Sequence, residues 1–271
     1  MAGELGAMRA LVPLLAVMAM ASACGGARRS APPHQPPVHA ALPSEVPPPE
    51  SLAAPTPTID DRVEQYGPSA RARLRPYFIA AGVPYPPQRF LLLGLKREHE
   101  LELYGAGPTQ SLHFIRSFDI LGESGNLGPK LLEGDRQVPE GVYRVVYLNP
   151  NSIAHLSLAV SYPNEFDRVH AEEDGREPDI LGGDIMIHGG SGSVGCLAIG
   201  DRAAEDLFVL AADAGWEKAV IVISPVDFRR AALPAGYQPS TSWVNQLYAW
   251  LRSTVDALPA PPRGSRAGAQ R

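Results

Sequence analysis

The sequence predicts a mainly β domain of the α+β class. Five short segments between residues 89 and 162 are rich in apolar, β-branched or aromatic residues, and turn residues bound each of them. Helical spacing is confined to one segment before this run and two segments after it. Strands and helices therefore do not alternate as in parallel α/β enzymes, and a strand-rich domain with a few flanking helices is expected.

The first predicted element is a short helix over residues 68–83, with Pro68 at its start and Gly82 near its end. The five strand segments follow it, and the charged KREHE between the first two is expected at a hairpin tip. They read RFLLLGL, ELELYG, LHFIRSFDIL, GVYRVVYL and HLSLAVSY, at residues 89–95, 100–105, 112–121, 141–148 and 155–162.

The second half of the chain predicts two shorter strands, DIMIH at 184–188 and CLAIG at 196–200. Residues 201–215 have helical spacing, an aspartate suited to N-capping, early acidic residues and a terminal glycine, which together favour a helix. AVIVIS at 219–224 is typical of a buried strand, and residues 242–258 are typical of an amphipathic helix.

Composition restricts the class of protein. The 271 residues fit one sizeable domain, and the formal net charge of −5 leaves no basic patch for a nucleic-acid partner. Two cysteines, Cys24 and Cys196, are too few for a disulfide framework.

The N-terminal region predicts export. Residues 1–23 resemble a bacterial lipoprotein signal peptide, because Arg9 precedes an apolar run that ends in small residues before Cys24. Cys24 is then the expected lipidation site, and an ordinary cleaved signal with a cysteine nearby is the alternative. Met8 is a second possible start of translation. The remaining regions are predicted as a proline-rich disordered linker at 24–59, a folded domain at 60–258 and a flexible tail at 259–271.

The segment IMIHGGSGSVGCLAIGD carries the candidate chemistry. His188 ends one predicted strand and Cys196 begins the next, and the glycine-rich loop between them can turn back because glycine accepts positive φ. An imidazole within hydrogen-bond reach can take the proton from a thiol and so activate it. Backbone N–H groups of Val194, Gly195 and Cys196 could stabilise an oxyanion. The alternative is a buried structural cysteine beside a core histidine. A zinc site is disfavoured because further ligands at a recognisable spacing are missing.

The motif IHGGSGSVGCLAI resembles the signature of the L,D-transpeptidase catalytic domain of the YkuD type, in its YafK-like branch. The stretches LGPKLLEGDRQVPEGVYRV, LNPNS and YPNEFDRVH extend the resemblance, which covers roughly residues 62–228. It implies a YkuD-like β-sandwich catalytic domain over residues 60–258.

The resemblance also implies residue roles. Cys196 would be the nucleophile, His188 the general base and acid, and the Gly189 carbonyl would orient the imidazole. Ser193 and Gly195 would shape the loop, and the N–H groups of Val194 to Cys196 would form the oxyanion hole. Two positions depart from the family pattern, since crosslinking members usually have histidine at Val194 and arginine or asparagine at Ala198.

The implied function is peptidoglycan L,D-transpeptidation, with stem peptides as partners and without a metal or organic cofactor. The alternatives are a hydrolase of the same family, which would cleave stem peptides or release a peptidoglycan-linked lipoprotein, and a lipoprotein that only binds peptidoglycan. The implied location is periplasmic, and Gly25 after the lipid-anchored Cys24 favours the outer membrane.

Other polar residues are expected to have background roles. His155 and His170 are expected on the surface or in loops, and Arg136 and Arg229 as surface charges, although a groove-lining or carboxylate-binding role is the alternative. The tryptophans are expected to pack; they are Trp216, Trp243 and Trp250.

Overall fold

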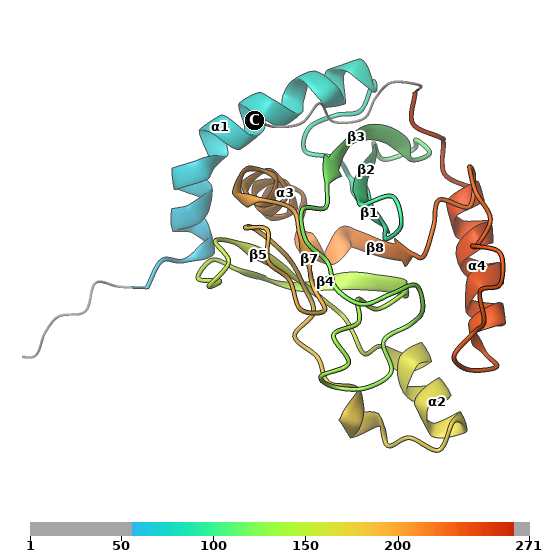
Figure 1. Ribbon diagram of the computed structural model, residues 1–271. Coiled ribbons are helices and arrows are strands. Elements are labelled where there is room, and N and C mark those ends of the chain that lie inside the picture. Colours follow the sequence, from blue (N-terminus) through green and yellow to red (C-terminus); the bar gives the residue numbers. More distant parts are fainter. Residues whose placement is uncertain (1–55, 263–271) are drawn as a thin grey trace, which may run out of the picture. The chain divides into compact units, whose positions relative to one another are not determined.

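The computed structural model describes residues 56–262 (Figure 1). The predicted signal peptide, Cys24 and nearly all of the predicted linker lie outside these residues, as does most of the tail. The regional boundaries and the lipidation of Cys24 therefore stay predictions.

The predicted α+β class is confirmed, with four α-helices and eight strands among the described residues. The strands are β1 (Arg89–Leu95), β2 (Glu100–Ala106), β3 (His113–Asp119), β4 (Gly141–Asn149), β5 (Ser157–Val160), β6 (Met186–His188), β7 (Leu197–Ala198) and β8 (Ala219–Ser224). The helices are α1 (Ile59–Ala80), α2 (Glu165–Glu173), α3 (Asp201–Ala214) and α4 (Val244–Asp256), with short 3-10 turns at Pro178–Leu181 and Trp216–Lys218.

All eight strands form one mixed sheet in the order β3-β2-β1-β8-β4-β5-β6-β7. The β1–β8 and β6–β7 pairs are parallel, and the other neighbouring pairs are antiparallel. The sheet curls strongly: a Cβ added at Gly94 in β1 would lie 3.3 Å from Leu197 Cδ1 in β7. Distant strands of the sheet therefore face each other across the interior.

The continuous apolar run of β1 reflects burial on both faces of the sheet. Phe90 and Leu92 belong to a core shared with α1 and α3, whereas Leu91 and Leu93 belong to a second core under α4. In Figure 1, α1 and α3 lie on one side of the central strands and α4 lies on the other. The alternation of side chains along a strand thus assigns each residue to one of two cores.

Helix α1 is longer than predicted. It begins at Ile59, where the Thr58 side chain and the Asp61 carboxylate form a capping box, so Pro68 lies inside the helix and not at its start. The predicted end is close to the observed one, because Gly82 follows the helix with a φ of 67°. The capping box was the missed N-terminal signal.

Two further differences concern helix starts. No helix is predicted from the sequence at 165–173, where α2 begins with a capping box formed by Asn164 and Asp167. Asp201 was expected to cap α3, but the N-cap is Gly200 and no side chain caps this helix. The Asp201 carboxylate instead accepts the Gly190 N–H at 2.7 Å.

A long irregular segment, residues 121–140, runs beside β7 and braces the region of the glycine-rich loop. Gly122 pairs with Ala198 of β7 in an isolated antiparallel bridge. At the far end of the segment, Lys96 Nζ lies 2.9 Å from Glu140 Oε1 and also donates to the carbonyls of Asn126, Gly128 and Val138. The predicted hairpin tip thus contains a buried lysine that holds this segment in place.

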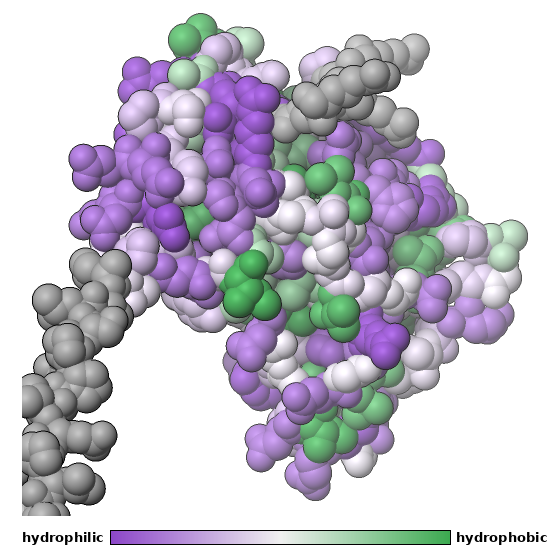
Figure 2. All heavy atoms as spheres, turned by 60° about the vertical axis from the view of Figure 1, so that its left-hand side comes forward, coloured by the Kyte–Doolittle hydropathy of each residue, from purple (hydrophilic) through white to green (hydrophobic). Residues whose placement is uncertain are grey.

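The face seen in Figure 2 is mostly hydrophilic, with separate apolar patches between the polar side chains. Within residues 56–262, no helix combines the length and the apolar character needed to cross a bilayer.

Candidate active site

The glycine-rich loop connects two adjacent parallel strands, so it carries the chain from the end of β6 back to the level at which β6 begins. In the β6–β7 register, Ile187 pairs with Leu197 and His188 with Ala198. Cys196 directly precedes β7, and its Sγ accepts the N–H of Met186 at 3.4 Å. The thiol therefore lies beside Met186 at the start of β6, and Met186 precedes His188 by two residues in the same strand.

The His188 imidazole is buried, and its Nδ1 lies 2.6 Å from the Gly189 carbonyl oxygen. A carbonyl can only accept, so Nδ1 carries the proton in this hydrogen bond and Nε2 is left as the acceptor. Gly189 is held closely: an added Cβ would lie 2.6 Å from Asp201 Oδ1 and 2.8 Å from the Ala154 carbonyl oxygen. Glycine is thus the residue that fits after this histidine.

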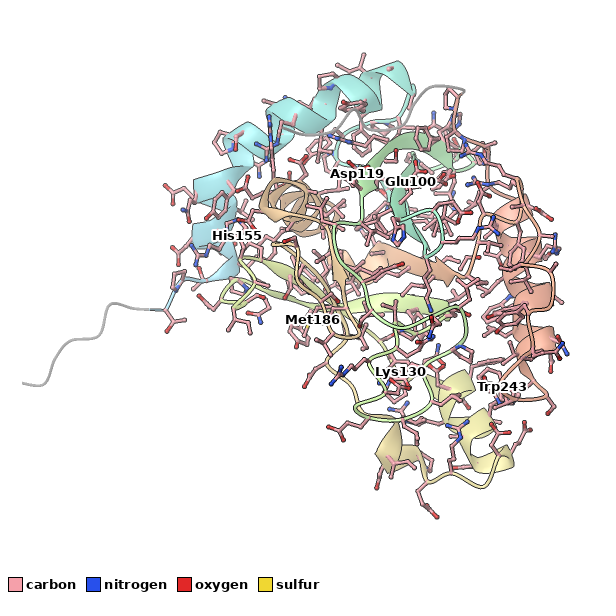
Figure 3. All side chains as sticks on the ribbon, viewed as in Figure 1. Glu100, Asp119, Lys130, His155, Met186 and Trp243 are labelled. Atoms are coloured by element: carbon pink, nitrogen blue, oxygen red, sulfur yellow. The ribbon has the colours of Figure 1, made fainter. Side chains whose placement is uncertain are left out.

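The Cys196 thiol is half-buried and hydrogen-bonds to backbone groups and not to the imidazole. Besides accepting from Met186, it donates to the Asp184 carbonyl oxygen at 3.7 Å. Burial raises the pKa of the thiol, the Met186 N–H opposes this rise, the Asp184 charge adds to it, and Lys130 lowers the pKa slightly. The resting sulfur is therefore a thiol, and a base must take its proton during a reaction. Figure 3 labels Met186 on the sheet and Lys130 on the adjoining loop.

Two serine hydroxyls fix the backbone on the N-terminal side of the thiol. Ser193 Oγ accepts the Cys196 N–H at 3.0 Å and donates to the Cys196 carbonyl at 2.6 Å. Ser124 Oγ accepts the Gly195 N–H at 2.7 Å and donates to the Arg136 carbonyl at 2.7 Å. Gly195 has a φ of 87°, which favours glycine at this bend. The loop is thus tied both to itself and to the 121–140 segment.

These bonds bear on the predicted oxyanion donors. The N–H groups of Gly195 and Cys196 are already hydrogen-bonded to hydroxyls, so an oxyanion would have to share or displace them. The Val194 side chain is 72% exposed and offers no polar group to a substrate. The oxyanion role of Val194 to Cys196 stays a prediction.

Sequence reasoning missed several residues that contact the site. Ser124 lies 71 positions before Gly195 in the chain, and nothing in the local pattern GESGNLG connects the two. Asp184 and Asp201 lie close to the motif in sequence. Asp184 contacts Cys196 through its backbone carbonyl, and Asp201 accepts the Gly190 N–H, and neither contact produces a residue spacing that can be recognised in the sequence. The one available signal was their nearness to His188 and Cys196 in sequence.

The histidines, arginines and tryptophans for which no direct role in the site was predicted have varied surroundings. His155 Nε2 lies 3.2 Å from Glu205 Oε1, and the His170 ring stacks on Trp243 with centroids 4.9 Å apart. Arg136 is exposed, as expected. The expectation of a surface charge at Arg229 is wrong, because this side chain is buried against the carboxylates of Glu102 and Asp227. Trp243 is buried, Trp216 packs partly against the main core, and Trp250 is 44% exposed.

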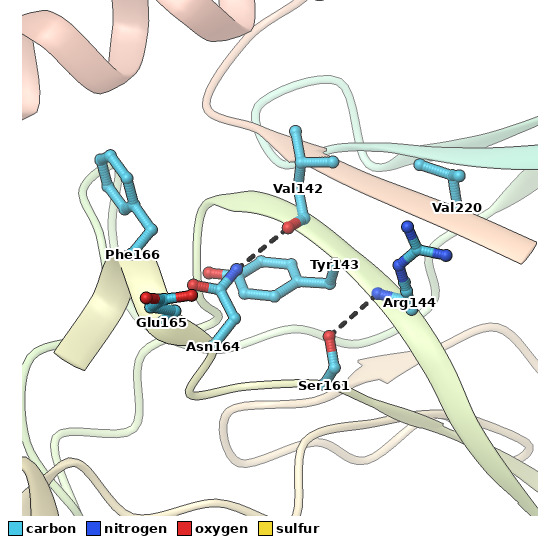
Figure 4. Close-up of a pocket in the computed structure, with 8 residues that line it drawn as sticks. All are labelled: Val142, Tyr143, Arg144, Ser161, Asn164, Glu165, Phe166 and Val220. Atoms are coloured by element: carbon cyan, nitrogen blue, oxygen red, sulfur yellow. Dashed lines mark hydrogen bonds between the residues drawn. The ribbon is translucent and has the colours of Figure 1, made fainter. Parts of the chain in front are cut away.

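A separate cavity of about 400 Å³ lies between the outer side of β4, Val220 of β8 and the start of α2 (Figure 4). The Asn164 side chain donates to the Val142 carbonyl in it, and the Ser161 hydroxyl accepts the Arg144 N–H. It shares no lining residue with the 184–196 segment. Within residues 56–262, no group of three or more His, Cys, Asp or Glu side chains is placed to hold a metal ion.

Nucleophilic acyl transfer by a cysteine requires a thiol and a base that can take its proton. Cys196, directly before β7, and His188, at the end of β6, are groups of these two kinds on adjacent strands.

Part of the chain is similar to known proteins. The chain is 34% identical over 115 residues to the "Putative L,D-transpeptidase YafK" of Escherichia coli K12, an alignment covering 42% of this chain and 43% of that protein. The same match is found with the protein of that name from Escherichia coli O157:H7. The similarity thus spans less than half of the curated relatives' length. No family model matches the chain.

Solved structures give weaker likenesses. The helical cell shape determining protein Pgp2 of Campylobacter jejuni has a TM-score of 0.40 and 23% identity, with 51% of this chain and 48% of that chain covered. L,D-transpeptidase 1 of Mycobacterium tuberculosis has a TM-score of 0.29 and 14% identity, with 50% of this chain and 62% of that chain covered.

Proposed function

We propose that the protein is a peptidoglycan L,D-transpeptidase in which Cys196 is the nucleophile and His188 the general base and acid. The observation that supports this proposal is the pairing of β6 with β7. Cys196 Sγ accepts the N–H of Met186, which lies two residues before His188, and His188 Nδ1 lies 2.6 Å from the Gly189 carbonyl oxygen. The similarity to YafK supports the choice of substrate.

In the proposed acylation step, His188 Nε2 takes the thiol proton while Sγ attacks the carbonyl of the L-centre of the third stem-peptide residue. The raised pKa of the Cys196 thiol favours this concerted transfer over attack by a preformed thiolate. The C–N bond to D-alanine breaks, and the imidazolium returns its proton to the leaving amine. A thioester on Cys196 remains.

In the second step, an amine from a neighbouring stem peptide attacks the thioester and the C–S bond breaks. The product is a new amide crosslink, and Cys196 regains its proton through His188. The donors that stabilise the two tetrahedral intermediates are the N–H groups near Val194, Gly195 and Cys196, with Ser193 holding the loop. The chemistry needs no metal or organic cofactor. The proposed location is the periplasm, with Cys24 lipidated and inserted in the outer membrane.

The test uses the purified full chain with disaccharide-tetrapeptide, analysed by mass spectrometry of products and of intact protein. A crosslinked dimer that has lost one D-alanine, together with a thioester on the protein, is expected. Cys196→Ala should abolish both signals. His188→Gln should lower the rate of thioester formation by about 100-fold or more.

A hydrolase is the second candidate, because the exposed Val194 offers no polar group to bind an acceptor at this position of the loop. Release of tripeptide without dimer would support this candidate. A thioester-free wild type that still binds peptidoglycan would contradict both enzymatic functions and favour a binding lipoprotein.

A further inference from the structure

We propose that Asp184 is the acceptor-binding residue of this site and that its carboxylate holds the protonated amine of the incoming stem peptide. This inference rests on the proposed function and names the part of the site that selects the second substrate.

Asp184 is in direct contact with the candidate nucleophile. Its carbonyl oxygen lies 3.7 Å from Cys196 Sγ, and the sulfur also accepts the N–H of Met186, two residues further on. The backbone from 184 to 186 therefore borders the thiol on one side. Asp184 is thus one of the residues from which a side chain could reach a substrate that is bound at the thiol.

The Asp184 side chain is available to a ligand. The residue is exposed, and among residues 56–262 its carboxylate takes part in no hydrogen bond or salt bridge. Lys130 is the other charged residue that acts on the thiol, and it already has a partner, because its Nζ lies 2.7 Å from Asp135 Oδ1. The exposed carboxylate of Asp184, by contrast, has no partner among the described residues.

Asp184 has a φ of 55°, in the left-handed region that aspartate and asparagine adopt more readily than most other residues with a side chain. A substitution by asparagine is therefore compatible with this backbone conformation.

The charge of this residue does not favour the nucleophile. A carboxylate near a thiol opposes formation of the thiolate, so an acidic residue is a disadvantage for acylation alone. A protonated primary amine, by contrast, is stabilised by a carboxylate through a charge-assisted hydrogen bond. The amine acceptor is the reactant that carries such a charge at neutral pH.

The acceptor ammonium bound to Asp184 loses one proton to solvent and attacks the thioester carbonyl as the neutral amine. The C–N bond forms and the C–S bond breaks. The second proton of the amine passes through His188 to the departing sulfur, so the products are the amide and the free thiol.

The test measures how the thioester is partitioned between two nucleophiles. Disaccharide-tetrapeptide serves as donor and as the cationic acceptor, and hydroxylamine, which is uncharged at neutral pH, competes as the second nucleophile. The ratio of dimer to hydroxamate is independent of the rate of acylation. In Asp184→Asn this ratio should fall about tenfold or more. Asparagine accepts positive φ, so the variant changes the charge and keeps the backbone.

Asp179→Asn is the matched control, because Asp179 is an exposed aspartate in the preceding 3-10 turn. Its product ratio should equal that of the wild type. An unchanged ratio in Asp184→Asn with a thioester present would overturn this inference and leave the proposed function intact.

Asp184→Gly is the second variant, since glycine also accepts the φ of this position. Loss of the thioester in both Asp184 variants but not in Asp179→Asn would assign Asp184 to the nucleophile or to folding and would overturn acceptor binding. A wild type without any thioester would overturn the proposed function and this inference together.

Discussion

The Cys196 sulfur lies between groups that act on its ionisation in opposite directions. Burial and the Asp184 charge raise the pKa of the thiol, whereas the Met186 N–H and Lys130 lower it. The net effect favours the neutral thiol at pH 7.

Alkylation should report this state. The rate of iodoacetamide modification of Cys196 is expected to rise with an inflection above about pH 8.5, the ordinary value for cysteine. Asp184→Asn should move the inflection to lower pH, because a negative charge next to the thiol is removed. Mass spectrometry of the peptide containing Cys196 separates its signal from Cys24. An inflection near pH 7 in the wild type would contradict the neutral resting thiol.

Asp167 predicts a pH effect on stability. Burial raises the pKa of this carboxyl to about 6 from an ordinary 3.8. The folded protein therefore holds this proton between about pH 4 and 6, and the corresponding stabilisation is lost as pH rises through 6. The Tm of Asp167→Asn relative to the wild type should increase between pH 4 and pH 7. A pH-independent Tm difference would show that Asp167 is not protonated in the folded state.

At the residue level, candidate site residues could be predicted where they lie close together in the sequence. His188, Gly189 and Cys196 could be chosen because their types and their spacing on a glycine-rich loop are readable in one short motif. Ser124 and Asp184 could not, since each contacts the site through a hydrogen bond set by tertiary structure. Arg229 was misjudged because its two buried carboxylate partners are distant from each other in sequence.

At the scale of elements, the 121–140 segment depends on the buried Lys96–Glu140 ion pair. Lys96 donates to three carbonyls of this segment as well as to Glu140, and Glu140 in turn accepts the Gly128 N–H. The segment has no regular secondary structure of its own, so these bonds maintain its conformation.

Lys96→Met should therefore be strongly destabilising, by about 3–5 kcal/mol, because it leaves a buried carboxylate without its counter-charge. Urea denaturation measures the change. Lys218→Met is the control; Lys218 is exposed, and a change within about 0.5 kcal/mol is expected. Equal effects of the two substitutions would mean that the buried pair contributes nothing to stability.

Strands were easier to predict than helix starts. The predicted limits of β1 and β8 agree with the structure, because strands buried on both faces are continuous apolar runs bounded by turns. Helix α2 was missed since its nine residues are mostly polar, and its capping box was the remaining signal. The pairing order of the strands depends on long-range contacts that no local pattern encodes.

At the scale of the whole molecule, stability depends on two cores on opposite faces of the central strands. The smaller core consists of α4 packed on β1 and β8, with Leu247 and Leu251 fully buried. Tyr248 of the same helix donates to Glu140 at 2.7 Å, so α4 is also connected to the segment that braces the candidate site.

Leu247→Ala should lower the free energy of unfolding by about 2–5 kcal/mol, the usual cost of a large-to-small change in a core. Gln246→Ala, at an exposed position of the same helix, should change it by less than about 0.5 kcal/mol. Urea denaturation followed by circular dichroism compares the two. A small effect of Leu247→Ala would indicate that α4 docks weakly on the sheet.

The bridge between Gly122 and Ala198 also affects how the molecule meets its neighbours. An open sheet edge can recruit strands of other molecules and so start aggregation. Here β7 has only two residues, and Gly122 already occupies hydrogen-bonding groups on its outer side. The opposite end of the sheet is β3, on which His113 and Asp119 are exposed whereas Arg116 is buried. Intermolecular strand addition is thus blocked at the β7 end of the sheet, and the exposed polar side chains at the two ends of β3 discourage it at the other.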